Sequence, residues 1–157
     1  MRLESYLNEN WVFPDDKTLK SDFSEYKKKE STKWRHRVDS IGARFPLFND
    51  FNHFKQSLKD AKVVNLRTGT DNQIQNRSHT SSLDSLKSLV GGYKRPRDVD
   101  RIVQGIESGA SMPMPIVLKG SRGMWIMAGN TRLDTAFILG NQPKVLMVDV
   151  SDQQYVN

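Results

Sequence analysis

The residues with the clearest chemical potential lie together in the segment Gly129-Asn130-Thr131-Arg132. Glycine allows a tight turn and a close approach of a ligand to the backbone, and arginine can bind a phosphate through two hydrogen bonds. The N-terminus of a helix carries N–H groups without intrahelical partners and a partial positive charge, which favour an anion. The spacing equally allows an ordinary helix start, in which Asn130 or Thr131 caps the helix and Arg132 lies on the surface.

The neighbouring sequence supplies the elements that would position this segment. Apolar runs at residues 115–118 and 124–128 flank a turn of Lys, Gly, Ser, Arg and Gly, which predicts a β-hairpin. Apolar residues at helical spacing follow the segment, and Gly140 is placed to end that helix. The apolar run at 144–150 predicts a third strand. The expected order is strand, turn, strand, glycine-polar elbow, short helix and strand.

A second cluster of cations lies beside the glycine pair Gly91-Gly92. Lys94, Arg95 and Arg97 fall within four residues, and Pro96 keeps Arg95 extended. The cluster is a candidate second phosphate clamp, although a basic surface loop would have the same composition. Phosphoryl transfer needs charge clamping and a base or positioning group. The acids near the proposed site, which are candidate catalytic residues or plain surface residues, are Asp98, Glu107 and Asp134.

The first half of the chain predicts helices and one strand. Pro14-Asp15-Asp16 predicts a helix start, and apolar residues at helical spacing follow as far as Tyr26. Helical spacing recurs from Phe51 to Ala61, and residues 63–66 predict a strand. Residues 67–82 are polar and predict a loop.

Two more helices are expected after this polar loop. Ser81 or Ser82 can cap the first of them. Asp98 can cap the second, and Gly109 ends it. The inner face of the first helix is expected to consist of Leu83, Leu86, Leu89 and Val90.

Cations also gather around an aromatic residue in the segment KKKESTKWRHR at residues 27–37. Lysine and arginine bind phosphates, and an indole can stack on an exposed base. The segment is therefore the candidate nucleic-acid contact outside the core, while a solvated, partly helical linker would have the same pattern. The residues concerned are Lys27, Lys28, Lys29, Lys33, Trp34, Arg35 and Arg37.

The composition limits the classes of function. A length of 157 residues suffices for one domain with a proper core, or for a small core with an extension. A net charge of +6 and a pI near 9.6 favour an anionic partner. The absence of cysteine excludes disulfides, thiolate catalysis and thiolate metal sites, and the three histidines lack metal-ligand spacing, so no metal ligands are predicted.

Several other classes are also excluded. The sequence contains no GxxxxGK[ST], HExxH or GxSxG motif, which argues against P-loop, zincin and hydrolase-elbow chemistry. It contains no run of about 18 apolar residues and no signal-peptide core. We therefore expect a cytoplasmic protein that does not bind a membrane.

Residues 83–150 resemble the ParB/sulfiredoxin superfamily in a series of motifs. Its members carry a basic, proline-containing segment, a helix ending in glycine, a P-I-x-V strand, a Gly-x-x-Arg elbow, a helix ending in L-G and a V-x-V-x-V strand. In this chain the series consists of Arg95-Pro96-Arg97-Asp98, the helix to Gly109, Pro115 to Leu118, Gly129 to Arg132, Leu139-Gly140 and Val145 to Val150. The sequence GNTRLDTAF, followed by PKVLMVDV, is also similar to ParB-like proteins of tailed bacteriophages.

The resemblance implies a mixed α/β fold of the α+β class, with packed helices on a small mixed sheet. It places a ParB/sulfiredoxin-like core at residues 81–157, after a mostly helical and basic N-terminal extension at residues 1–80. It further implies that Gly129 to Arg132 hold the phosphates of ATP or CTP and that Arg95 and Arg97 face the nucleotide. Phosphoryl transfer usually also uses a metal ion, for which Mg²⁺ is the candidate. The elbow lacks the cysteine that sulfiredoxin activity needs, and its one arginine departs from the doubly basic elbow of partition proteins.

Three functions remain as expectations. The first is a nucleotide-dependent phosphotransferase or NTPase that works with DNA, encoded by a phage and located in the host cytoplasm. The second is a DNA-binding or nuclease-type accessory protein without nucleotide turnover. The third is a non-catalytic interaction module in which the elbow is a relic of the fold. The sequence leaves the reaction, the phosphate acceptor and the oligomeric state open.

Overall fold

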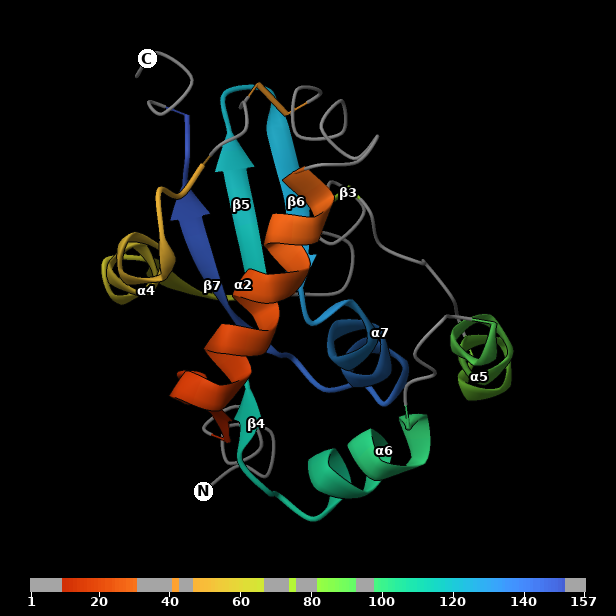
Figure 1. Ribbon diagram of the computed structural model, residues 1–157. Helices are drawn as coiled ribbons and strands as arrows, with labels where there is room; N and C mark the ends of the chain where they lie inside the picture. Colours follow the sequence, from red (N-terminus) through yellow and green to blue (C-terminus); the bar gives the residue numbers. More distant parts are fainter. Residues whose placement is uncertain are drawn as a thin grey trace.

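The computed structural model describes residues 10–30, 41–42, 47–66, 74–75, 82–92 and 98–151. Its centre is a mixed five-stranded sheet with the strand order β2-β7-β5-β6-β3 (Figure 1). β5 (Ile116–Gly120) and β6 (Gly123–Ala128) form an antiparallel hairpin, and β7 (Lys144–Asp149) lies parallel to β5 on its other side. The hairpin and the third strand that the sequence predicts are confirmed.

The edges of this sheet come from the first half of the chain. β2 (Lys62–Asn65) pairs antiparallel with β7, as its apolar pattern predicts, and β3 (Ile74–Gln75) pairs parallel with β6. The loop prediction for residues 67–82 is therefore wrong at β3, because Ile74 is buried and adds a short strand. Residues on both sides of the predicted boundary at 80/81 thus share one sheet.

A second, two-stranded sheet joins the beginning of the described chain to the approach of the hairpin. β1 (Trp11–Val12) pairs parallel with β4 (Met112–Pro113). The Trp11 indole N–H also donates to the side-chain oxygen of Asn141 at 2.9 Å, in a buried hydrogen bond. Neither β1 nor this contact is apparent in the sequence pattern, because a two-residue strand shows no alternation.

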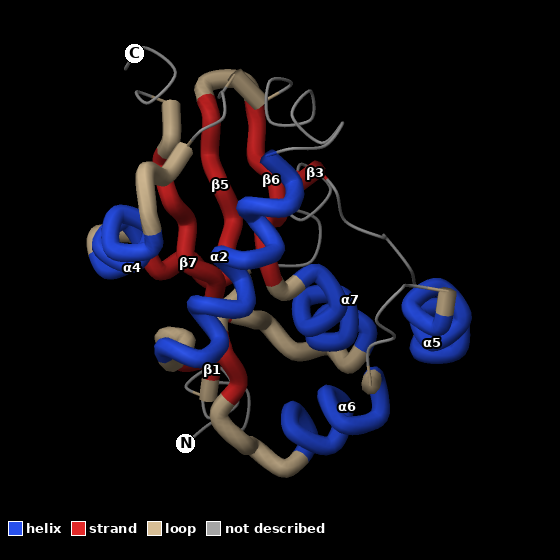
Figure 2. The backbone as a smooth tube through the Cα atoms, in the orientation of Figure 1, coloured by secondary structure: helices blue, strands red, loops and turns tan. Residues whose placement is uncertain are grey.

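Helices pack around the two sheets (Figure 2). Together, these elements confirm the predicted α+β class. No helix in the part of the chain that the structure describes is long and apolar enough to cross a membrane. The described helices are α2 (Asp16–Glu30), α4 (Phe51–Lys59), α5 (Leu83–Gly91), α6 (Val99–Glu107) and α7 (Asn130–Ile138).

The five-stranded sheet separates two hydrophobic clusters. Alternate residues of a strand face opposite sides of a sheet. Ile116 and Leu118 of β5 therefore point into the larger cluster, where Leu19 of α2 is fully buried. Val117 points into the other cluster, which Leu133 of α7 completes. α2 thus packs on one face of the sheet, whereas α7 contributes Leu133 to the cluster on the other face and Ala136 to the larger cluster.

Tyr26 connects α2 to the chain before α4. Its buried hydroxyl oxygen accepts hydrogen bonds from the backbone N–H groups of Leu47, at 2.7 Å, and Phe48, at 3.3 Å. The ring of Tyr26 also packs edge-on against Phe48 and is stacked with Phe23. Tyr26, Phe48 and Phe54 are all buried in the larger hydrophobic cluster.

The predicted inner face of α5 is wrong at one position. Leu86 and Val90 are buried, whereas Leu89 is 40% exposed. α5 lies at the periphery and packs mainly against α6 and α7 (Figure 1). Its buried stripe is therefore narrow, and Leu89, rotated by about 100° from Val90, falls outside it.

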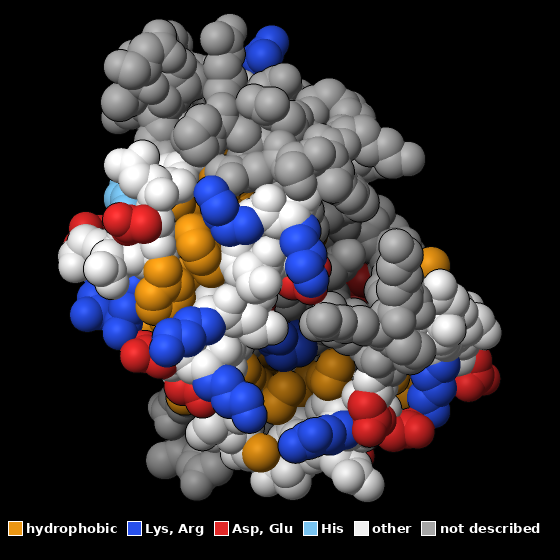
Figure 3. Space-filling model, in the orientation of Figure 1, with side chains coloured by type: hydrophobic (Ala, Val, Ile, Leu, Met, Phe, Trp, Pro, Cys, Tyr) orange, Lys and Arg blue, Asp and Glu red, His pale blue; other side chains and the backbone are white. Residues whose placement is uncertain are grey.

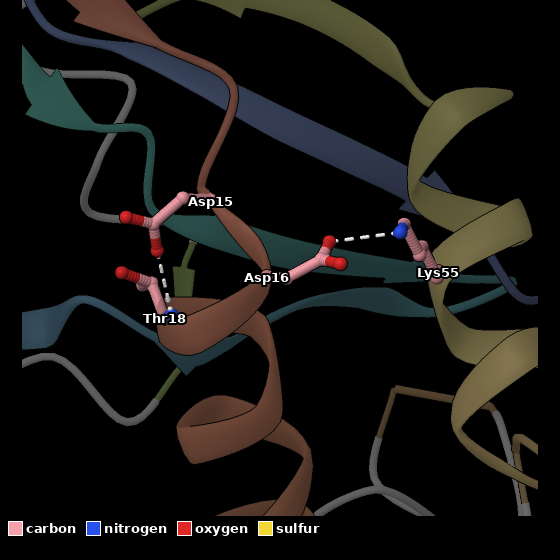
Figure 4. A network of polar contacts seen from close by, with 4 residues as sticks. All are labelled: Asp15, Asp16, Thr18 and Lys55. Atoms are coloured by element: carbon pink, nitrogen blue, oxygen red, sulfur yellow. Dashed lines mark hydrogen bonds and ion pairs between the residues drawn. The ribbon is translucent and has the colours of Figure 1, made fainter.

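The first turn of α2 is held by two acids (Figure 4). The Asp15 carboxylate accepts from the backbone N–H of Thr18 at 2.8 Å, and this hydrogen bond lowers the pKa of Asp15. Asp16 forms an ion pair with Lys55 of α4 at 2.8 Å, and the hydrogen bond to Lys55 lowers the pKa of Asp16. The helix start predicted at Pro14-Asp15-Asp16 is confirmed.

We predict that these two carboxylates make folding stability depend on pH. The variant Asp15→Asn/Asp16→Asn keeps a capping side chain but cannot ionise. At about pH 7 it should melt below the wild type, because carboxylates whose pKa lies below the usual 3.8 stabilise the folded state above that value. The difference in melting temperature between variant and wild type should disappear as the pH falls through the lowered pKa values of the two carboxylates. Thermal unfolding across this pH range measures it, and a constant difference would contradict the prediction.

Candidate functional site

The elbow between β6 and α7 is formed by a glycine in the left-handed conformation. Gly129 has φ 88° and ψ 22° and is the N-cap of α7. A Cβ atom at this position would lie 2.9 Å from the Cα and Cβ atoms of Pro115 and from Nη2 of Arg132. Both the backbone conformation and the close contact therefore require glycine, and the predicted turn is confirmed.

The predicted side-chain cap of α7 is wrong. Asn130 and Thr131 lie inside the first turn of the helix, and the N-cap position belongs to Gly129, which has no side chain to accept a hydrogen bond. The other helices in the described ranges begin differently. At each of their starts, a side-chain oxygen accepts a hydrogen bond from a backbone N–H group. These oxygens belong to Asp15 at α2, Asp50 at α4, Ser82 at α5 and Asp98 at α6.

Arg132 folds back over the elbow. Its side chain is half-buried, and its Nε donates to the carbonyl oxygen of Pro113 at 3.2 Å. Arg132 is therefore tied to the backbone of β4 rather than fully exposed, and its contact with a phosphate stays a prediction. The guanidinium therefore holds β4 against the beginning of α7 while it keeps a positive charge at the elbow.

A groove of about 870 Å³ runs along α6 and the chain that leads into β4. Arg101, Gln104 and Ser108 lie three and four residues apart, so they share one face of α6 and form a polar side of the groove. Ile102 and Met112, both half-buried, supply apolar surface. The arrangement of apolar surface with a few polar groups is typical of a small-molecule site.

Gly105 shapes this groove. Glycine inside a helix costs about 0.5–1 kcal/mol relative to alanine. A Cβ atom at position 105 would lie 2.9 Å from the Sδ atom of Met112. The glycine therefore lets the Met112 thioether lie against the surface of α6.

The groove and the elbow are neighbours through β4. Met112 lines the groove, and the next residue, Pro113, accepts the hydrogen bond from Arg132. The groove is not predicted from the sequence. The sequence feature that could have indicated it is the spacing of Arg101, Gln104 and Ser108, which places three polar side chains on one face of the helix that Asp98 is predicted to cap.

The three candidate acids do not come together. Asp98 caps α6, where its carboxylate accepts from the backbone N–H of Arg101 at 3.0 Å. Glu107 is exposed and lines the groove at the other end of the same helix, which is about 13 Å long. Asp134 is buried in α7, with 1% of its surface exposed. Of the three, Glu107 is the acid that lines the groove.

The remaining candidates fall partly outside the described residues. Lys27 and Lys28 lie exposed on α2, and Lys29 belongs to the same helix, although its side chain is not described. The predicted phosphate clamp of Lys94, Arg95 and Arg97 lies outside the described residues, as do Lys33, Trp34, Arg35 and Arg37.

Within the described ranges, no group of three or more His, Asp or Glu side chains is placed to hold a metal ion. Comparison with protein-family models, with curated proteins and with solved structures finds no match for this chain.

We predict that Gly129 is needed for its contacts as well as for its conformation. Gly129→Ala should lower the free energy of unfolding by about 1–3 kcal/mol more than Gly140→Ala does, because overpacking adds to the cost of a left-handed alanine. Gly140 is the matched control, since it has φ 75° but nothing within 4 Å of an added Cβ. Denaturant unfolding measures both variants, and equal losses would contradict a role for the Pro115 contact.

Proposed function

We propose that this protein binds a nucleotide, with its phosphates at the start of α7 and its nucleoside in the groove along α6. The observation that carries the proposal is the position of β4. This strand places Met112 in the groove and the Pro113 carbonyl against Arg132, so the groove, which is partly apolar, and the charged elbow adjoin. A nucleotide has the same two parts, an apolar and hydrogen-bonding base next to a polyanion.

The elbow suits the phosphates. The first turn of α7 presents the positive end of a helix, and its N-cap residue, Gly129, makes no side-chain cap hydrogen bond. Arg132 adds a guanidinium that can bind phosphate oxygens, since arginine carries several N–H donors in a planar fork. The net charge of +6 attracts an anionic ligand.

The groove suits the nucleoside. The face of a base can pack against Ile102 and the polarizable thioether of Met112. Arg101, Gln104 and Ser108 offer hydrogen-bonding groups for the edge of the base and for ribose hydroxyls. The resemblance of residues 83–150 to the ParB/sulfiredoxin superfamily supports the same assignment and favours ATP or CTP as the ligand.

Phosphoryl transfer, with Mg²⁺ supplied in solution, is the reaction that this proposal favours. Such a reaction depends mainly on positioning and on neutralising charge. Glu107 is the acid available in the groove to orient an acceptor or to contact the metal, because Asp98 is used as a helix cap. The alternative is a DNA-binding or nuclease-type accessory protein that binds nucleotide without turnover.

We predict that ATP or CTP raises the melting temperature and that Arg132→Gln weakens this binding about 10-fold or more, because a hydrogen bond to a charged group contributes about 1.5–3 kcal/mol. Arg122→Gln is the matched control. It removes an exposed arginine at the opposite end of β6, about 20 Å away. Titration followed by thermal shift or calorimetry measures the affinities.

Two outcomes would reject the binding site. One is the absence of a shift with either nucleotide, and the other is an equal loss in both arginine variants. Because Arg132 also bonds to Pro113, Gln104→Ala supplies a second variant without that structural contact. It should weaken nucleotide binding while leaving the melting temperature of the ligand-free protein within the usual range for a surface change, equivalent to about 0.5 kcal/mol.

A separate prediction concerns turnover. Glu107→Gln should reduce the release of phosphate from the bound nucleotide in the presence of Mg²⁺ without weakening nucleotide binding, since the change removes a charge but keeps the size of the side chain. Phosphate release under single-turnover conditions measures this effect. If the wild type binds nucleotide but releases no phosphate, the phosphotransferase function is rejected and the accessory-protein function is retained.

A further inference from the structure

One exposed face of α2 carries only lysine and serine. Successive residues of a helix are rotated by about 100°, so positions 17, 20, 21, 24, 27 and 28 share one side. All six side chains are exposed, opposite the buried Leu19 and Tyr26. We call this surface the α2 stripe, and it consists of Lys17, Lys20, Ser21, Ser24, Lys27 and Lys28.

The acids of α2 lie beside this stripe rather than within it. Asp16 turns toward α4, where it pairs with Lys55 at 2.8 Å (Figure 4). Asp22 and Glu25 are half-buried on the flank, and Glu25 approaches Lys28 at 3.8 Å. Figure 3 shows lysine and arginine side chains spread over the face that α2 crosses, with the acids mostly toward its borders.

We propose that the α2 stripe is a docking surface for the phosphodiester backbone of a nucleic acid. Lys17 and Lys28 are eleven residues apart, so the stripe is about 16 Å long and carries one positive charge per about 4 Å. One strand of duplex DNA carries a phosphate per about 3.4 Å. The charge densities match, and the hydroxyls of Ser21 and Ser24 can also donate to phosphate oxygens.

The stripe fits a nucleic acid better than a membrane surface. A helix that lies in a membrane interface inserts large apolar side chains between lipids. α2 buries its apolar residues in the core, and the stripe itself contains none. Val12 and Phe13, which are 38% and 39% exposed, precede α2, so anionic vesicles form the competing arm of the test.

This surface is independent of the proposed nucleotide site. It lies on α2, whereas the groove and the elbow are built from α6, β4 and α7. The inference can therefore fail while nucleotide binding holds, and the reverse is also true. The expected DNA partner is thereby assigned to a described helix whose exposed lysines share one face.

The test measures binding of the full chain to fluorescent duplex DNA, single-stranded DNA and single-stranded RNA at rising salt. Four phosphate contacts predict a slope of log K against log salt near about −3.6 on duplex DNA, which is a loss of about 100-fold between 50 and 200 mM salt. Lys17→Gln/Lys20→Gln/Lys28→Gln should weaken binding about 10-fold or more and reduce the slope by about three. The three polymers distinguish a duplex from a single-strand partner, and RNA from DNA.

The matched control is Lys59→Gln/Lys62→Gln/Lys119→Gln, which removes the same charge from exposed lysines on other elements. It should retain binding within about twofold, because surface changes away from a contact have small effects. Loss in the stripe variant alone supports the proposal, provided that its melting temperature and nucleotide binding match those of the wild type. The proposal is overturned if both variants lose binding equally or if the protein binds none of the three polymers. It is also overturned if the protein binds polyglutamate, a polyanion without phosphates, as tightly as it binds nucleic acid, or if it binds only phosphatidylserine vesicles.

Discussion

The left-handed turn at Gly129 is the constraint on which the site and much of the fold depend. Because this residue has no Cβ, the chain can leave β6, pass against Pro115 and enter α7 without a spacer. The same compact turn brings Arg132 close enough to bond the Pro113 carbonyl. One glycine thus fixes the relative positions of β4, β5, β6 and α7, and with them the junction of groove and elbow.

The rest of the molecule supports this junction from both faces of the sheet. On one face, Leu19 and Tyr26 of α2 pack over β5 and β6 and fix the chain before α4 through the Tyr26 hydroxyl. On the other face, Leu133 seats α7 against Val117. The part of the chain before residue 80 therefore contributes side chains to the larger cluster and supplies both edge strands of the five-stranded sheet.

Local patterns in the sequence were sufficient for the elements that carry their own signals. The apolar runs of the hairpin, the cap at Asp98 and the terminating Gly140 all act within a few residues, and the structure has them where expected. β1 and β3 depend on partners far along the chain, so two residues alone cannot reveal them. The groove was missed for a similar reason, since it needs Met112 and α6 to meet around Gly105.

The hydrogen bond between Trp11 and Asn141 has a consequence for the order of events during synthesis. The two residues are 130 positions apart. At about 5–20 residues per second, Trp11 is synthesised roughly 6–26 s before Asn141. α2 and β1 must wait as well, because the strands on which they pack come late in the chain. The apolar side chains of α2 and β1 therefore lack their partner strands for most of translation.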